Sequence, residues 1–337
     1  MAPRHPRVGI KDVAQLAGVS VGTVSNVLNR PSSVSDGRKA AVEAAIVELG
    51  YVPDHAARQL KGVRSQLIGY LFPNPLNPYY SNLADGIERE AERRGLDVLT
   101  ANTRGQQHQH DHYLSLFERQ LARGIIVAVG NGDLSRELAL SRRGTPVVLA
   151  SAHAGDRLLC SVGSDDVAGG ELALAHLVTS GCRRIVVMMA RGLAASERRW
   201  AGARAAAEKH RVRIELVPVS ELSVDAGRIA MQDLLARPAG ERPDAVFAVS
   251  DLVALGALLA VVADGRLRVP RDVSLVGYDD LPYAASAIVA LTSIRQHEEQ
   301  IGGIAVGMIE HALADPHHEH SHVLLDPVLV RRESTRG

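Results

Sequence analysis

The stretch Asp12–Asn29, which reads DVAQLAGVSVGTVSNVLN, contains two short helical patterns separated by a glycine. In the first, which begins at Ile10, apolar residues recur at helical spacing and share one face. Gly18 permits a tight turn, and Ser20 is a favourable N-cap for the second helix. Helices joined by so short a turn meet at a steep angle, so the second can enter the major groove of DNA. The pattern predicts a helix-turn-helix, with an ordinary helical hairpin as the alternative.

The second helix divides into an inner and an outer face. Val24, Val27 and Leu28 recur at helical spacing and are expected to face inward. The outward positions are then Val21, Gly22, Ser25 and Asn26. The Asn26 amide can pair with N6 and N7 of adenine, so it has the chemistry to read a base. A third helix is expected from Ser35 to a stop at Gly50, because glycine is favoured just after a helix.

Charge is distributed unevenly along a chain that is neutral overall. Residues 1–66 contain nine Lys or Arg and five Asp or Glu, which leaves a net charge of +4 there and −4 in the remainder. A small basic module attached to an acidic body is typical of a phosphate-binding headpiece on a body that does not bind nucleic acid.

From residue 66 onward, short apolar runs alternate with amphipathic stretches. The runs are LIGYLF (67–72), DVLTAN (97–102), GIIVAV (124–129), PVVLAS (146–151), RIVVMM (184–189), AVFAVS (245–250) and VSLVGY (273–278). The helical stretches between them include 82–94, 169–180, 197–209 and 252–264. Repeated β-α units with apolar strands predict an α/β fold with parallel sheets covered on both faces. The number of runs fits two sheets better than one, with a second lobe beginning near Asp165.

The bulk composition narrows the class of protein. At 337 residues the chain is long enough for two or three domains. No apolar stretch reaches the roughly 18–20 residues that cross a bilayer, and no secretory signal is recognisable, so we expect a cytoplasmic protein without membrane contact. Cys160 and Cys182 form no CxxC pair and are expected to be reduced structural thiols.

The whole chain, over residues 8–335, resembles the lac repressor family of transcriptional regulators. The resemblance rests on words in the family's order: IKDVAQLAGVS, TVSNVLN, ELGYVP, AARQL, NPYY, AVSDLVALGAL, VPRDVSLVGYDD, LTSIRQ and VRREST. It implies a headpiece at 1–53, a hinge at 54–66 and an effector-binding and dimerisation domain at 67–337. That domain would resemble periplasmic binding proteins and have two doubly wound lobes, one at about 67–165 plus 297–324 and the other at about 166–296 plus 325–337.

The resemblance also implies which residues meet DNA. Val21 and Gly22 match positions that vary in the family with the operator, and Asn26 stands where many members have arginine. DHAARQL (54–60) matches a hinge helix that folds on operator DNA, with Leu60 as a minor-groove wedge. A flexible linker is the alternative there, because seven residues are too few for a stable isolated helix. The full set of expected DNA contacts is Ser20, Val21, Gly22, Thr23, Ser25, Asn26, Asn29, His55, Arg58, Leu60 and Lys61.

The family's effector lies between the lobes, at the carboxyl ends of the strands. The matching positions are Asn77, Tyr79, Tyr80, Asn102, Ser151, Arg199, Leu222, Ser250, Asp279 and Gln296. These side chains suit a hydroxyl-rich ligand. Three features depart from the family's sugar-binding pattern: Ser151-Ala152 stands where an Asp-Arg pair is common, Leu222 where an aromatic residue often stacks on a sugar, and Ser250 where Asn is usual. A sugar is therefore the first expectation, with a nucleoside, an organic acid or no effector as alternatives.

The remaining motifs point away from catalysis. The segment 130–135 (GNGDLS) lacks the third glycine and the ribose-binding acid of a dinucleotide fingerprint. The histidines at 108, 110 and 112 and at 317, 318, 320 and 322 are interpreted as solvated loop residues without a cysteine partner, so no metal and no cofactor are expected. An α/β enzyme would need a catalytic constellation, and a transporter's solute receptor would need a signal peptide and no headpiece. We therefore expect a repressor, not an enzyme, that binds palindromic double-stranded operator DNA as a homodimer.

Overall fold

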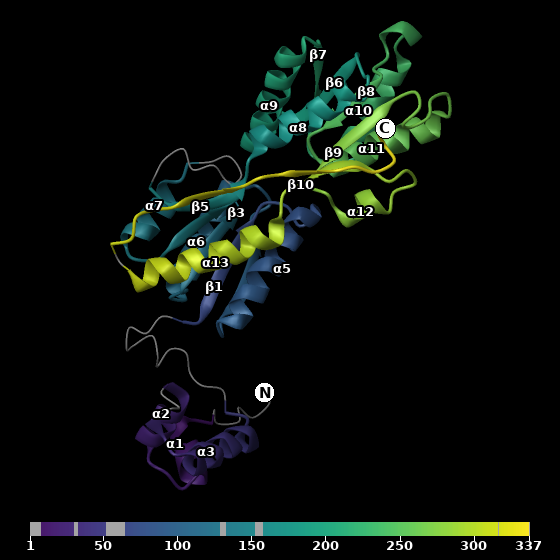
Figure 1. Ribbon diagram of the computed structural model, residues 1–337. Helices are drawn as coiled ribbons and strands as arrows, with labels where there is room; N and C mark the ends of the chain where they lie inside the picture. The colour runs from purple at the N-terminus through teal and green to yellow at the C-terminus, as the bar shows by residue number, and fades with distance from the viewer. Residues whose placement is uncertain are drawn as a thin grey trace. The chain divides into compact units, whose positions relative to one another are not determined.

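The computed structural model describes residues 8–29, 33–51, 65–128, 133–151, 158–315 and 317–336. Contacts within the chain divide it into a unit of residues 1–65, here called the headpiece, and a unit of residues 66–337, here called the core domain (Figure 1). Each unit is described by itself.

The headpiece contains three helices around a small apolar centre. These are α1 (Ile10–Leu16), α2 (Val21–Asn29) and α3 (Asp36–Leu49). Val13, Val24 and Val42, one from each helix, are fully buried against one another. Gly50 ends α3 with a φ of 58°, a left-handed conformation that glycine adopts without steric cost. The predicted helix-turn-helix and third helix are confirmed.

The first sheet of the core domain has the strand order β11-β5-β4-β3-β1-β2, and every pairing in it is parallel. Its strands are β1 (Leu67–Phe72), β2 (Asp97–Asn102), β3 (Gly124–Ala128), β4 (Val147–Ala150), β5 (Cys160–Ser164) and β11 (His322–Leu325). Alternate strand residues point to opposite faces, so Ile126 packs in one apolar layer and Ile125 in the other. The layers are completed by α5 (Pro78–Arg93) and α13 (Glu298–Ala314), and by α6 (Gln107–Arg119) and α7 (Ser135–Arg142).

The second sheet has the order β12-β10-β9-β8-β6-β7 and is parallel except for β12, which runs antiparallel to β10. Its strands are β6 (Ile185–Ala190), β7 (Ile214–Val219), β8 (Ala245–Ala248), β9 (Ser274–Tyr278), β10 (Thr292–Arg295) and β12 (Val328–Val330). Helices α8 (Asp166–Thr179) and α9 (Ala194–His210) cover one face, and α10 (Val224–Ala236) and α11 (Asp251–Asp264) the other. The short α12 (Pro282–Ala285) follows β9. The expected α/β fold with two covered, mainly parallel sheets is confirmed.

Glycine permits close packing of α5 against α13, the two helices that cover one face of the first sheet. A Cβ on Gly86 of α5 would lie 2.2 Å from the Glu299 carbonyl oxygen, and one on Gly302 of α13 would lie 2.6 Å from the Leu83 oxygen. Both distances are too short for any side chain, so the two helices approach backbone to backbone. This contact fixes α13, which lies far along the chain, against the first sheet.

In the described chain, the polypeptide passes between the two sheets three times: after β5, after β10, and between β11 and β12 (Figure 1). Two of these crossings are bonded to each other, because the Asp165 N–H donates to the Leu325 carbonyl at 3.0 Å. No helix among the described residues is long and apolar enough to span a bilayer.

Candidate functional site

One side of α2 exposes side chains that could contact another molecule. Ser20 caps the helix, and its Oγ accepts a hydrogen bond from the Thr23 N–H at 3.0 Å. Burial of Val24 leaves Val21, which is 41% exposed, on the opposite side. Ser20, Gly22 and Asn26 are also exposed, whereas Thr23 and Ser25 are half-buried. The short side chains of this surface allow the helix backbone to approach a groove closely.

The other expected DNA contacts are not placed. His55, Arg58, Leu60 and Lys61 lie outside the described residues, as does the side chain of Asn29. Their roles stay predictions from the resemblance.

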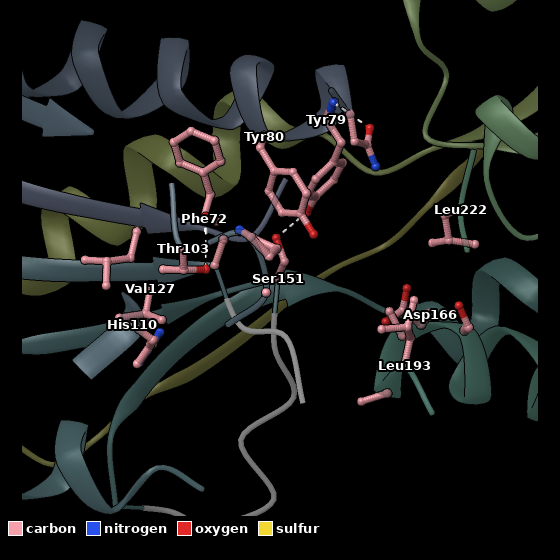
Figure 2. A pocket seen from close by; sticks show the side chains of 18 of the residues that line it. Phe72, Tyr79, Tyr80, Thr103, His110, Val127, Ser151, Asp166, Leu193 and Leu222 are labelled. Atoms are coloured by element: carbon pink, nitrogen blue, oxygen red, sulfur yellow. Dashed lines mark hydrogen bonds between the residues drawn. The ribbon is translucent and has the colours of Figure 1, made fainter. Parts of the chain in front are cut away.

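A cavity of about 450 Å³ lies between the two sheets of the core domain, near the carboxyl ends of their strands. In Figure 2, Tyr79, Tyr80 and Ser151 lie on one side of it and Asp166, Leu193 and Leu222 on the other. Of the ten positions expected to bind the effector, eight line this cleft, namely Asn77, Tyr79, Tyr80, Ser151, Arg199, Leu222, Asp279 and Gln296.

Asn102 and Ser250 do not line the cleft. The side-chain Oδ1 of Asn102 accepts a hydrogen bond from the Arg104 N–H at 2.8 Å, which ties this side chain to a turn. Ser250 is fully buried, and its hydroxyl donates to Asp279 Oδ2 at 3.2 Å. Ser250 is therefore placed to orient a cleft residue.

An aromatic wall forms the first-sheet side of the cleft. Phe72, at the end of β1, stacks on Tyr80 with ring centroids 6.1 Å apart, and Tyr79 meets Tyr80 edge to face at 5.3 Å. The start of α5 positions both tyrosines, because Asn77 caps the helix by accepting the Tyr79 N–H at 3.0 Å. The Asn77 oxygen is thus engaged, which leaves its NH₂ group for a ligand. The Tyr79 hydroxyl bonds to the Ser151 hydroxyl.

Buried charges form the opposite side. Arg199 Nε donates to Asp166 Oδ1 at 2.9 Å, and its Nη1 donates to the Val249 carbonyl at 2.7 Å. The guanidinium also lies 3.7 Å from the Tyr278 ring centroid, within cation–π range. Arg198 Nη2 donates to the second oxygen of Asp166 at 2.8 Å. These contacts hold the arginines in place, so neither is a freely available cation.

Asp279 lies at the centre of this network. Gln296 Nε2 donates to its Oδ1 at 2.6 Å, and Arg199 Nη1 lies 3.5 Å from the same oxygen. Burial raises the pKa of Asp279 to about 6, although nearby Arg199 favours its charged form. Its backbone has a φ of 107°, a strained conformation for a non-glycine residue, of a kind that occurs often at binding sites.

Several lining residues were not predicted. Asp166 and Arg198 come from α8 and α9, with Leu193 and Ser196 nearby in the chain, whereas His110 and Glu137 come from α6 and α7 on the first-sheet side. Asp166 begins α8, two residues after the end of β5, whose sequence CSVGS is less apolar than most of the other buried strands. The acid after that strand was the available signal.

The interpretation of the histidines as solvated loop residues was wrong for most of them. His110 lies on α6, and its Nε2 is 2.5 Å from Oε1 of the buried Glu137. His322 begins β11, and His318 and His320 both lie 3.6 Å from the sulfur of Cys160. The strand pairing of β11 with β5 brings them to a cysteine more than 150 residues away in the sequence.

Comparison with known proteins gives two family matches. Residues 9–54 match the family described as bacterial regulatory proteins, lacI family, and residues 174–335 match a periplasmic binding protein-like domain. The ribose operon repressor of Escherichia coli (strain K12) is 32% identical over 329 residues, 96% of this chain and 99% of the relative.

Two solved structures have the same fold. One is the lac repressor dimer bound to operator and the anti-inducer ONPF, which is 28% identical, with a TM-score of 0.86 over 98% of this chain and 100% of that one. The other is a transcriptional regulator CelR–cellobiose complex, 29% identical, with a TM-score of 0.72 over 97% of this chain and 100% of that one. The helix-turn-helix, the two-lobed core and these likenesses agree, and the chain belongs to the lacI family of bacterial regulatory proteins.

Proposed function

We propose that the protein represses transcription by binding a palindromic operator as a homodimer, with α2 in the major groove. The observation that carries this proposal is the exposed, short-chained surface of α2, with Asn26 as its base-reading side chain. The similar lac repressor is a dimer on its operator. One three-helix headpiece offers few phosphate contacts, and two related by a twofold axis match a palindrome. Its DNA target would place the protein in the bacterial cytoplasm.

The domain boundaries are part of the proposal. Residues 54–66 would connect the headpiece to the core and, with Leu60 as a wedge, fold against the minor groove. Arg58 and Lys61 would contact phosphates nearby. A change in the core domain then reaches DNA through the spacing of two hinges.

The cleft favours a neutral, hydroxyl-rich effector over an anion. Its described lining contains four carboxylates (Asp133, Glu137, Asp166 and Asp279) and two arginines. Both arginines are already paired with Asp166, so an organic acid would meet excess negative charge and no free cation. Glu137 Oε2 and Ser196 Oγ are buried and have no hydrogen-bond partner within the described structure. A sugar hydroxyl can donate to the first and accept from the second.

The aromatic wall supports the same class of ligand. The tyrosines and Phe72 supply an apolar surface for a ring face, and Gln296, Asn77 and Ser151 supply polar edges. The similar CelR structure contains cellobiose, a sugar. We therefore assign the cleft to a sugar or a comparable polyol.

The test measures DNA binding with and without candidate effectors. Fluorescence anisotropy on palindromic duplexes selected from a random library should show salt-sensitive, sequence-specific binding. A neutral sugar should change that affinity, whereas carboxylate analogues of the same size should not. Absence of any preferred palindrome would disprove the DNA assignment, and a response only to acids would disprove the effector assignment.

A further inference from the structure

The amino end of β5 holds a cluster of metal-binding side chains far from the cleft. Cys160 is the first residue of β5, and His318 and His320 lie in the segment that leads into β11. We propose that Cys160, His318 and His320 bind a zinc ion. This site stands independently of the function proposed for the cleft and for DNA.

The distances fit the proposal. The Cys160 sulfur lies 3.6 Å from His318 Nε2 and 3.6 Å from His320 Nδ1, and the three atoms lie within 4.8 Å of one another. Zn–S bonds of about 2.3 Å and Zn–N bonds of about 2.0–2.1 Å at tetrahedral angles place sulfur and nitrogen about 3.6 Å apart. Both observed sulfur–nitrogen distances therefore match the ligand–ligand distance expected in a tetrahedral zinc site.

The hydrogen bonding of His318 prepares it as a ligand. Its Nδ1 lies 3.1 Å from the backbone carbonyl oxygen of Asp315, which accepts only from a protonated nitrogen. The proton on Nδ1 leaves the lone pair of Nε2 directed toward Cys160. A ligand histidine whose other nitrogen donates to a carbonyl is typical of metal sites, because that bond fixes the tautomer and the ring orientation.

The donor set selects the class of ion. One thiolate and two imidazoles are ligands for zinc and other thiophilic ions, whereas magnesium and calcium require oxygen. Cys160 is only 4% exposed, and both histidines are half-buried, so the ion would be partly shielded from water. Among the described residues no fourth donor joins this group, so water or a small ligand would complete the tetrahedron.

The position of the cluster means that a bound ion would stabilise the edge of the first sheet. β11 is a four-residue strand at the edge of the first sheet, paired only with β5 among the described strands. An ion held by Cys160 and the two histidines would tie the segment after α13 to β5. It would also lie at the amino ends of parallel strands, the edge opposite the cleft.

The experiment uses the full-length protein, reduced and stripped of metal with a chelator, and titrates it with Co²⁺ and then Zn²⁺. We expect one Co²⁺ per chain, visible d–d bands of tetrahedral cobalt and a thiolate-to-cobalt charge-transfer band, all removed by one equivalent of Zn²⁺. Cys160→Ser should abolish the charge-transfer band. His318→Gln and His320→Gln should each weaken Zn²⁺ binding by about 100-fold or more, measured by competition with a chelating dye.

Matched variants separate this site from incidental binding. Cys182→Ser removes the other buried cysteine, and His317→Gln changes an exposed histidine in the same segment. Both should bind like the unaltered protein. Binding without a charge-transfer band, or equal losses in the control variants, would overturn the proposal. If Cys160→Ser does not fold by circular dichroism, the two histidine variants decide, and unchanged affinity in both would also overturn it.

Discussion

Nε of Arg199, on α9, lies 2.9 Å from Oδ1 of Asp166, on α8, and both side chains are buried. Asp166 also pairs with Arg198, and Arg199 approaches Asp279, so the ion pair belongs to a network on the wall of the cleft. The network joins α8, which follows the first passage of the chain between the sheets, to Asp279 at the end of β9. The ion pairs that stabilise the core domain therefore also form part of the surface that a ligand in the cleft would contact.

Breaking this pair should destabilise the core domain strongly. Asp166→Asn removes the carboxylate that Arg198 and Arg199 share and leaves Arg199 with only the longer carboxylate contact, to Asp279. Removing one partner of a buried pair typically costs about 3–5 kcal/mol. The free energy of unfolding, measured by urea denaturation, should show this loss. Glu215→Gln breaks the exposed pair with Arg237 and should cost no more than about 1 kcal/mol. Equal effects of the two substitutions would contradict the assigned network.

Asn26 should determine sequence specificity. We expect Asn26→Ala to cost about 1–3 kcal/mol of binding free energy on the preferred duplex and little on random DNA. Val47→Ala, which changes an exposed residue of α3, is the control and should leave both affinities unchanged. Anisotropy titrations on the two duplexes measure the difference, and equal losses on both would show that Asn26 contacts only the DNA backbone.

Leu60 should bend the operator. Its role comes from the family resemblance, since it lies outside the described residues. Leu60→Ala should lower both the DNA affinity and the bend angle, because an inserted side chain kinks the duplex by unstacking a base step. Circular-permutation gel shifts measure the bend. An unchanged angle would remove the wedge role.

The aromatic wall should determine effector affinity without affecting DNA binding itself. Phe72→Ala removes a stacked ring that lines the cleft, so a higher sugar concentration should be needed to change DNA affinity. Tyr113→Ala removes an aromatic ring of α6 that is not part of the described cleft lining, and serves as the matched control. Calorimetry with the sugar and anisotropy without it separate the two effects. A loss of DNA affinity in the absence of sugar would argue against a pure effector role.

Glu298 should make stability depend on pH. Burial raises its pKa from the ordinary 4.5 to about 8, and the nearby Asp279 charge adds to the effect. The folded protein holds the Glu298 proton more tightly than the unfolded chain does. Proton binding to Glu298 therefore stabilises the fold fully below the pKa of Glu298 in the unfolded chain, and this contribution is lost as pH rises through about 8. Each tenfold difference in proton affinity corresponds to about 1.4 kcal/mol.

The comparison of variants isolates that contribution. Relative to Glu298→Gln, the unaltered protein should lose free energy of unfolding between about pH 5 and pH 9, in the range that the pKa change sets. Glu299→Gln, at the exposed neighbouring position, should show the same pH profile as the unaltered protein. A profile for Glu298→Gln that parallels the unaltered one would show that Glu298 is not titrating in this range.

Most of the strands that could be predicted are buried on both faces; the exception is the edge strand β2, predicted from DVLTAN, in which only Ala101 is buried. β1, β3, β4, β6, β8 and β9 are continuous apolar runs, which is what a sheet covered by two helical layers requires. β7 and β11 are edge strands in which only Val219 is buried, and β5 contains serine and glycine. Their sequences lack the apolar signal, so they were not recognised.

The site residues that could be predicted are those that match positions or motifs shared with the family, and the others were not predicted. Tyr79, Asp279 and Gln296 lie next to quoted motifs or within them, and the structure brings them to one cleft. The pairs His110–Glu137 and Cys160–His318 depend on contacts between distant segments. Local periodicity contains no information about such contacts, because they arise only when the strands take their order in the sheet.

The three passages of the chain between the two sheets limit how the lobes can move. Twisting one lobe against the other would stretch at least one connection, whereas bending changes their lengths little, so ligand exchange should occur by bending. We expect the same arrangement to limit the effect of proteolysis. A single backbone cut in any one passage would leave two others intact, and the severed protein would keep both halves of its pocket together.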